Sequence, residues 1–206
     1  RAIAHSIDLQ LFLNYYPGGL AEIIYRSMSS VSWAYPEGLT EAYYPYDNTA
    51  NRDKIRAELD LAVADGYLTS VGNAYYYNGK PLKLTFTISG DTQDHPAYQV
   101  LYNAAEVLNN NFGTDITVKT DISALKKLAT GSLQVWAAAW SSTVDPDMYQ
   151  VYCSANAHGE GTNSNHYQIT DSELDTLIVD ARSSSDNAYR KATYKTCFDI
   201  ILDWGV

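Results

Sequence analysis

The clearest hydrophobic pattern is an alternation of apolar and polar residues in the central third of the chain. Residues 82–88 read LKLTFTI, in which leucine, phenylalanine and isoleucine alternate with lysine and threonine. This is the spacing of a strand. Two more strands and two helices follow in the pattern. The expected strands cover residues 82–88, 114–120 and 133–140, and the expected helices cover residues 94–113 and 122–131. Because helical crossovers of this length join parallel strands, we predict an α/β fold with a βαβαβ core.

Helical spacing also predicts flanking elements on both sides of this core. The expected helices lie in residues 1–16, in residues 51–66, after a capping box formed by Thr170 and Glu173, and from about 186 to 204. A turn signal, Asn78-Gly79, stands before the first core strand and predicts a hairpin there. Within the core, Asp121 is expected to cap the helix that begins at residue 122.

Length and charge narrow the classes of protein to consider. The 206 residues suit one large domain, or one lobe of a larger protein, with a sizeable core. The formal net charge of −10 argues against nucleic acid as a partner, because phosphate neutralisation needs clustered Lys and Arg. The apolar runs are too short to span a membrane. The chain opens as helix interior without a capping residue and closes directly after a helical pattern, so we expect a segment of a longer protein.

A polar loop after the third core strand is the candidate ligand surface. Parallel strands share one edge at their carboxyl ends, and ligands of α/β proteins bind along that edge. Here Trp140 offers an apolar face, and Ser141, Ser142, Thr143 and Asp145 follow it. Two other readings stay open. Trp140 can simply cover the core, and Asp145-Pro146-Asp147 is also a typical start of a helix.

Catalytic and metal-binding chemistry has little support in the sequence. Asp145 and Asp147, two residues apart across a proline, could do acid–base chemistry, but nothing in the sequence identifies a partner for them. A G-x-S-x-G elbow, a P-loop, an H-E-x-x-H and a C-x-x-C are all missing. His158, Glu160 and His166 stand among Gly, Asn and Ser, which predicts a loop, and we expect neither metal nor cofactor.

Two cysteines are too few for a disulfide scaffold. Cys197 lies on an apolar helical stripe, which favours a buried free thiol. Cys153 lies near a loop, and a bridge between the two stays open because geometry decides it.

Seven segments, in order, carry a resemblance to a known family. They read RAIAHSID, SWAYPEG, YYPYDNTANRDKIRAELDLAVADGY, NGKPLKLTFTIS, GSLQVWAAAWSSTVDPDMYQVY, DSELDTLIVDAR and DWGV. Together they resemble the C-terminal lobe of the extracytoplasmic solute-binding proteins, family 5, of oligopeptide and dipeptide ABC transporters. The resemblance covers nearly the whole chain.

The resemblance implies a fold and a function. Residues 1–206 would form a single lobe of the type II periplasmic-binding-protein kind, and the N-terminal lobe and signal peptide would lie outside this sequence. Peptide would bind between the two lobes and pass to the ABC permease, outside the cytoplasm, on a lipoprotein or a periplasmic protein. In the family an Asp in this loop holds the α-amino group of the peptide, and the nearest acid here is Asp145. Trp33 and Trp140 would supply apolar walls.

Other functions remain to be weighed against this one. The same transport role with an oligosaccharide or a metal chelate as ligand is compatible with the Tyr and Trp content. A hydrolytic enzyme that uses Asp145 or Asp147 is the alternative from another class, although we expect no enzyme. A surface interaction module without transport is a fourth reading.

Overall fold

The computed structural model describes residues 1–37 and 50–206. The described residues form two compact units, and each is described by itself. The first unit comprises residues 1–23, 50–125 and 133–138, and the second comprises residues 24–37, 126–132 and 139–206. The start of the quoted YYPYDNTANRDKIRAELDLAVADGY segment lies outside the described residues. The expectation of a single lobe over residues 1–206 stays a prediction.

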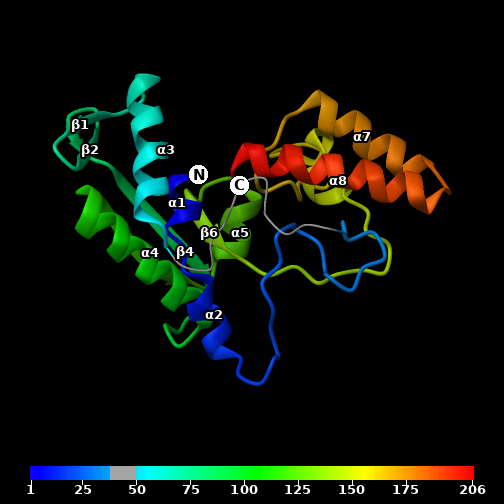
Figure 1. The fold of residues 1–206 in the computed structure, drawn as a ribbon, viewed down its shortest axis with the longest axis horizontal. Coiled ribbons are helices and arrows are strands. Elements are labelled where there is room, and N and C mark those ends of the chain that lie inside the picture. Colours follow the sequence, from blue (N-terminus) through cyan, green and yellow to red (C-terminus); the bar gives the residue numbers. More distant parts are fainter. Residues whose placement is uncertain (38–49) are drawn as a thin grey trace. The chain divides into compact units, whose positions relative to one another are not determined.

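The first unit is built around a parallel sheet of three strands, with helices beside it (Figure 1). Its strands are β4 (Lys83–Ser89), β5 (Asp115–Asp121) and β6 (Val135–Ala137), in the order β5-β4-β6. The crossovers contain α4 (Pro96–Phe112) and α5 (Ala124–Ala129). Ser89 is opposite Asp121, and Ile88 is opposite Ala137, so the carboxyl ends of all three strands meet at one edge. The predicted α/β class and βαβαβ core are confirmed.

The third core strand is shorter than predicted. It covers only Val135–Ala137 of the expected residues 133–140, so Trp140 lies three residues beyond its end. Two hydrogen bonds lie where the pairing of β6 with β4 begins and ends. The Gln134 side chain accepts from the Thr85 N–H at 2.9 Å and so takes the place of a backbone partner before the strand. After Ser89, the N–H of Gly90 donates to Asp121 O at 3.3 Å, so this backbone group pairs with β5.

The helix after β5 also starts later than predicted. Asp121 is the last residue of β5, and its carboxylate accepts from the Ser123 N–H at 2.8 Å. This contact forms a turn before the helix, and α5 begins only at Ala124. Asp121 therefore does not cap a helix at residue 122, because its side chain satisfies an N–H outside the helix.

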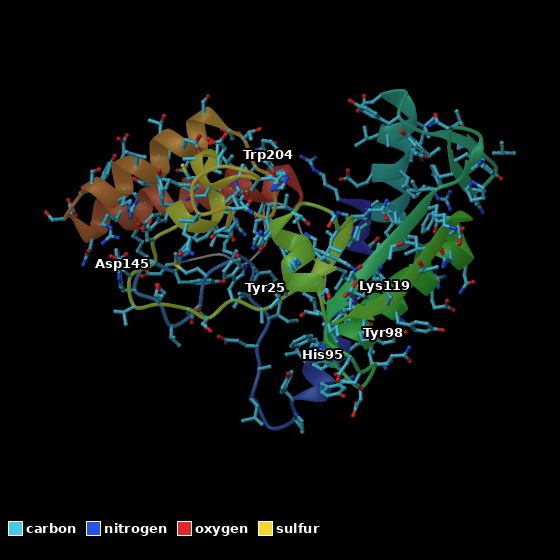
Figure 2. All side chains as sticks on the ribbon, turned by 180° about the vertical axis from the view of Figure 1, so that it is seen from behind. Tyr25, His95, Tyr98, Lys119, Asp145 and Trp204 are labelled. Carbon is cyan, nitrogen blue, oxygen red and sulfur yellow. The ribbon has the colours of Figure 1, made fainter. Side chains whose placement is uncertain are left out.

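Helix α4 matches its predicted position, with Pro96 in the first turn. The His95 ring caps it, because Nδ1 accepts from the Ala97 N–H at 3.1 Å. His95 and Tyr98 lie at this end of the helix (Figure 2). Gly113 ends it with a φ of 62°, the left-handed conformation that glycine adopts without strain.

The elements before β4 follow the predicted helix and hairpin. Helix α3 (Arg52–Ala64) begins at its cap Asn51. A small antiparallel sheet follows, with strands β1 (Thr69–Val71), β2 (Ala74–Tyr77) and β3 (Lys80–Pro81). Asn78 and Gly79 connect β2 to β3 with φ values of 50° and 75°. Positive φ at both central residues is what a tight two-residue hairpin turn requires.

The first predicted helix is two helices. They are α1 (Ala2–His5) and α2 (Leu9–Tyr15). Side chains compete with the backbone at the break. The Ser6 hydroxyl donates to Ile3 O at 2.6 Å, and the Asp8 carboxylate accepts from the Gln10 N–H at 3.0 Å. The second contact is an N-cap, so Asp8 starts a new helix in the middle of a continuous apolar pattern.

The core of the first unit lies around β4. Phe86, Thr87 and Ile88 are all at most 1% exposed, although their side chains point alternately to opposite faces. Both faces of the central strand are therefore covered, as expected for a parallel sheet. The core also includes residues of α3, α4, β2 and β5: Ile55, Leu59, Tyr75, Leu101, Ala104, Ala105, Leu108, Phe112 and Ile116.

The second unit is mainly helical. Its elements are α6 (Tyr149–Tyr152), the 3₁₀ turn η1 (Ser154–Asn156), α7 (Ser172–Ser183) and α8 (Asn187–Trp204). Helices α7 and α8 pack against each other around a buried cluster that includes Leu174, Ile178, Tyr194, Cys197 and Phe198. Cys153 and Cys197 are both buried and free, so the predicted buried thiol at Cys197 is confirmed. No helix in residues 1–37 and 50–206 has the length and apolar character needed to cross a bilayer.

The start of α7 corrects the predicted capping box. The cap is Asp171 and not Thr170. Its carboxylate accepts from the backbone N–H groups of Glu173 and Leu174, both at 3.0 Å. It also accepts from the indole N–H of Trp204 at 3.1 Å, which joins the end of α8 to the start of α7. A carboxylate serves two N–H groups better than a hydroxyl does, and its charge suits a helix N-terminus.

We expect this cap to make stability depend on acid pH. Hydrogen bonds from Leu174, Trp204 and Glu173 lower the pKa of Asp171 below its usual value. The folded state therefore binds this proton less tightly than the unfolded state does, so the contribution is present above the unfolded pKa and is lost as the pH falls through the folded pKa. Urea unfolding between pH 6 and pH 2 measures it (both limits are about two units from the usual carboxyl pKa). Asp171→Asn is expected to flatten the acid limb, and Asp180→Asn, an exposed change on the same helix, is expected to leave it unchanged.

Candidate functional site

The candidate site is the segment of residues 138–148, which follows β6 and has no helix or strand. Its polar residues Ser141, Ser142, Thr143 and Asp145 are all exposed. Trp140 is 50% exposed, so this indole is not a core residue. The segment therefore offers an aromatic ring, hydroxyl groups and a carboxylate to solvent.

The Trp140 ring stacks on the imidazole of His166. The ring centroids are 5.9 Å apart, and the planes differ by 16°. Partial burial lowers the pKa of His166, which favours the neutral form of the imidazole. The stacked pair is consequently a flat aromatic surface of which the Trp140 ring is half exposed.

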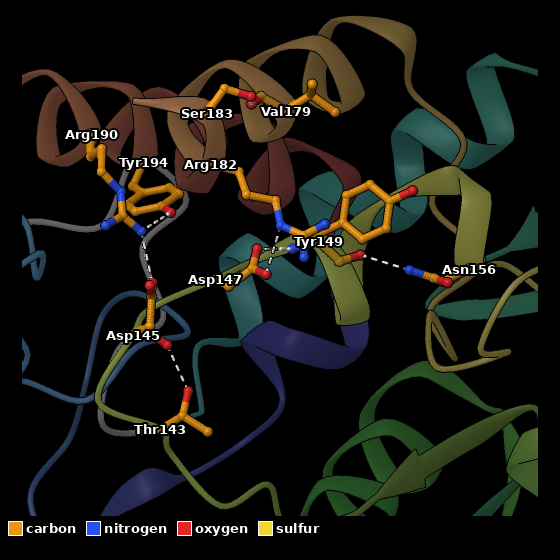
Figure 3. A network of polar contacts seen from close by, with 10 residues as sticks. All are labelled: Thr143, Asp145, Asp147, Tyr149, Asn156, Val179, Arg182, Ser183, Arg190 and Tyr194. Atoms are coloured by element: carbon orange, nitrogen blue, oxygen red, sulfur yellow. Dashed lines mark hydrogen bonds and ion pairs between the residues drawn. The ribbon is translucent and has the colours of Figure 1, made fainter. Parts of the chain in front are cut away.

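Asp145 is held by a cation from α8. Its Oδ1 atom accepts from Nη2 of Arg190 at 2.7 Å, as Figure 3 shows. The Thr143 hydroxyl donates to the backbone oxygen of Asp145 at 2.6 Å, which bends the chain between these residues. The Asp145 side chain remains 64% exposed. The acid is thus ordered and still accessible.

Arg190 is itself tightly enclosed, with a side chain that is 13% exposed. Its guanidinium lies 5.2 Å from the ring centroid of Trp33 and 5.7 Å from that of Tyr194. Nη2 also donates to the Tyr194 hydroxyl at 3.1 Å, and this contact, with Asp145, raises the pKa of Arg190. Burial raises the pKa of Tyr194. The group is therefore a permanent cation between two aromatic rings.

Asp147 forms a separate ion pair. Its Oδ2 atom lies 3.0 Å from Nε of Arg182 on α7 (Figure 3). Its Oδ1 atom accepts from the Tyr149 N–H at 3.0 Å at the start of α6. Arg182 in turn lies over the Tyr149 ring, 4.5 Å from its centroid. Asp147 thus accepts from the first N–H of α6, although the cap residue of this helix is Met148, and Asp145 makes no such contact.

The predicted site residues fall into separate groups. Trp33 and Asp145 contact Arg190, and Thr143 contacts Asp145. Trp140 packs on His166. Ser141 and Ser142 lie exposed, without a hydrogen bond to another described residue. Sequence reasoning missed Arg190 and Tyr194, and it considered His166 only as a metal ligand and not as the partner of Trp140. The spacing of Arg190 and Tyr194, four residues apart on a helix, was an available signal for their contact.

The predicted loop of residues 157–166 has no helix or strand, and buried amides organise it. Asn165 is fully buried, and its side-chain N–H groups donate to Ile169 O at 2.8 Å and Cys153 O at 3.1 Å. His158 contacts the backbone oxygen of Ala129 through Nδ1 at 3.2 Å. Over the described ranges, no three His, Cys, Asp or Glu side chains converge as ligands of a metal ion.

Comparison with solved structures finds strong similarity of fold. The oligopeptide-binding protein AppA from Bacillus subtilis, in complex with a nonapeptide, matches 98% of this chain with a TM-score of 0.77 and 19% identity. DppA from Helicobacter pylori, in complex with the peptide STSA, matches 98% with a TM-score of 0.73 and 20% identity. NikZ from Campylobacter jejuni, in complex with Ni(L-His), matches 96% with a TM-score of 0.73 and 18% identity. No family model and no curated relative matches the sequence.

These matches define the class of fold. The chain has the α/β fold of a segment of the substrate-binding proteins that serve peptide ABC transporters, as the resemblance implied. It spans 39%, 36% and 38% of the three matched chains. All three are described as binding proteins or as complexes with a small ligand. The fold is therefore that of a binding protein segment, covering less than two fifths of each relative.

Proposed function

We propose that this chain is one lobe of the substrate-binding component of an ABC importer, and that it binds peptides. The observation that carries the proposal is the shared fold over 98% of the chain with two proteins solved with a peptide bound. In this proposal the ligand lies in a cleft between this lobe and a second lobe. Closure of the two lobes holds it, and no bond is made or broken.

The loop after β6 supplies groups that suit a peptide. The Trp140–His166 stack and the partly exposed Trp33 are apolar surfaces for side chains. The exposed hydroxyls of Ser141 and Ser142 suit backbone amides, since a hydroxyl both donates and accepts. The exposed carboxylate of Asp145 suits the α-amino group of the peptide.

A role in import also implies where the protein is located and which partners it has. The importer role requires a location outside the cytoplasm, as a periplasmic protein or a cell-surface lipoprotein. The partners are the ABC permease, an N-terminal lobe of the same protein and a peptide or other small solute. NikZ, which was solved with Ni(L-His), matches this chain with the same TM-score of 0.73 as DppA. A metal chelate is therefore the main alternative ligand.

Isothermal calorimetry on the complete protein that contains this segment tests the proposal. Short peptides with free amino termini are expected to release heat with saturable binding, and Ni(L-His) and an oligosaccharide mixture are the comparison ligands. Saturable binding of either comparison ligand, with no heat from any peptide, would overturn the peptide assignment. Asp145→Asn is expected to weaken binding by about tenfold, the value of one charge-assisted hydrogen bond.

The contacts of the two acids favour binding over hydrolysis. Asp145 and Asp147 pair with different arginines, on α8 and α7. The two carboxyl groups of a glycoside hydrolase flank one substrate bond, whereas the ion pairs here direct each acid to a different helix. Turnover of any substrate that disappears in Asp145→Asn would contradict a pure binding role.

A further inference from the structure

We infer that Arg190 is a positioning residue of the ligand site, which sets the orientation of the Asp145 carboxylate for the amino terminus of a peptide. The inference rests on the proposed function and adds the residue that gives Asp145 its specificity. The sequence assigned no role to Arg190, which lies 45 residues from its partner.

Arg190 is more fixed in position than Asp145. Asp145 belongs to a segment without helix or strand and is 64% exposed, so its own backbone contributes little order. Arg190 lies on the 18-residue helix α8, and its guanidinium is enclosed by Trp33 and Tyr194. Because the enclosed partner moves less, the 2.7 Å contact transfers its order to the carboxylate.

The hydrogen bond from Arg190 leaves one oxygen atom of the Asp145 carboxylate available to a ligand. Arg190 binds Oδ1, and the Thr143 hydroxyl binds the backbone oxygen of Asp145. Among the described residues, Oδ2 has no hydrogen-bond partner. A carboxylate has lone pairs on both oxygens, so one can accept from a guanidinium while the other accepts from an ammonium group. Arg190 and a ligand ammonium therefore bind together and do not compete for one atom.

Removal of Arg190 could either strengthen or weaken the binding of a free amino terminus, depending on how Arg190 acts. If Arg190 acted only through its charge, its removal would strengthen the binding of a cationic amino terminus, because two like charges would no longer lie near each other. If it orients Asp145, its removal weakens the same binding. The interaction between the charges is screened at an exposed carboxylate, whereas orientation at hydrogen-bond distance is not. The expected sign is weaker binding.

The test uses Arg190→Gln in the complete protein, with a short peptide and its N-acetylated form as the two probes. Calorimetry is expected to show the dissociation constant of the free-amine peptide rising about tenfold, the loss of one charge-assisted contact. The acetylated peptide has no ammonium group, so its weaker binding is expected to change less than about twofold. A double variant with Asp145→Asn is expected to add nothing to the loss in the free-amine peptide, because both changes remove one interaction.

Lys191→Gln is the matched control. It removes one positive charge from the next position of α8, where Nζ lies 2.5 Å from the exposed Glu37. We expect this variant to bind both peptides as the unaltered protein does. Hydrogen exchange gives a second readout that needs no ligand, and residues 139–148 are expected to exchange faster in Arg190→Gln while α7 does not.

Each outcome decides one of the two claims. Equal losses for both peptides, tighter binding of the free-amine peptide, or unchanged affinity would overturn the role of Arg190 and leave the proposed function standing. Unchanged exchange of residues 139–148 would also overturn it. If the unaltered protein binds no peptide, the proposed function fails, and the inference fails with it.

Discussion

Asp199→Ala is expected to lower the free energy of unfolding by about 3–5 kcal/mol, the cost of leaving a buried charge without its partner. The Arg26 side chain is only 2% exposed, and its Nη2 lies 3.0 Å from Oδ1 of Asp199 on α8. Within residues 1–37 and 50–206, the other contact of this guanidinium is from Nη1 to Tyr25 O at 2.9 Å, and its buried Nε has no partner there. Without Asp199, the Arg26 guanidinium keeps one neutral acceptor among the described residues, the backbone oxygen of Tyr25. Urea unfolding followed by circular dichroism measures the change.

Lys195→Gln is the control for this prediction. Lys195 is the second cation beside Asp199, at 3.2 Å, and its side chain is 52% exposed. An exposed ion pair one helical turn apart is worth about 0.5 kcal/mol or less, so this variant is expected to unfold almost as the unaltered chain does. A loss in Asp199→Ala no larger than the loss in Lys195→Gln would show that Arg26 is not dependent on its partner.

Phe86→Ala is expected to cost the first unit about 3–5 kcal/mol, the range for removing a buried aromatic ring. Phe86 is fully buried at the centre of β4, between Val118 of β5 and Val135 of β6. The cost combines lost burial with a cavity that the sheet cannot close, because strands on both sides hold the backbone in place. Urea unfolding, with hydrogen exchange of the β4 amides, measures the loss.

Tyr77→Ala gives the comparison for Phe86→Ala. It removes a larger side chain from β2, where Tyr77 is 56% exposed. We expect a loss below about 1 kcal/mol, as for a surface change that creates no cavity. Similar losses at the two positions would mean that the interior of the β4 layer contributes far less than its burial suggests.

The order of the core elements was predictable because their periods are local properties of the chain. Residues 82–88 alternate with a period of two and residues 94–113 carry a helical stripe, and both became the expected elements. The errors lie where a single side chain decides a boundary. Asp8 starts a second helix inside an apolar run, and Asp171 replaces Thr170 as a cap. Such competition between a side chain and the backbone has no periodic signal.

The candidate site was predictable only in part, for a different reason. The polar loop after Trp140 follows from the rule that strands end at a ligand edge. The role of Arg190 depends on a contact across 45 residues and on enclosure by Trp33, which is further away still. A charged residue on a helix normally predicts a solvated face, so the sequence offered no reason to select this one. Tertiary geometry alone brings it to Asp145.

The two buried cysteines make it possible to follow unfolding by the reactivity of native thiols. Burial raises the pKa of the Cys197 thiol to about 12, and that of Cys153 is also raised. Reaction with a thiol-specific dye needs the thiolate and access to it, so we expect neither sulfur atom to react in the folded state. Dye uptake over time would therefore follow the opening of the second unit, without any introduced probe.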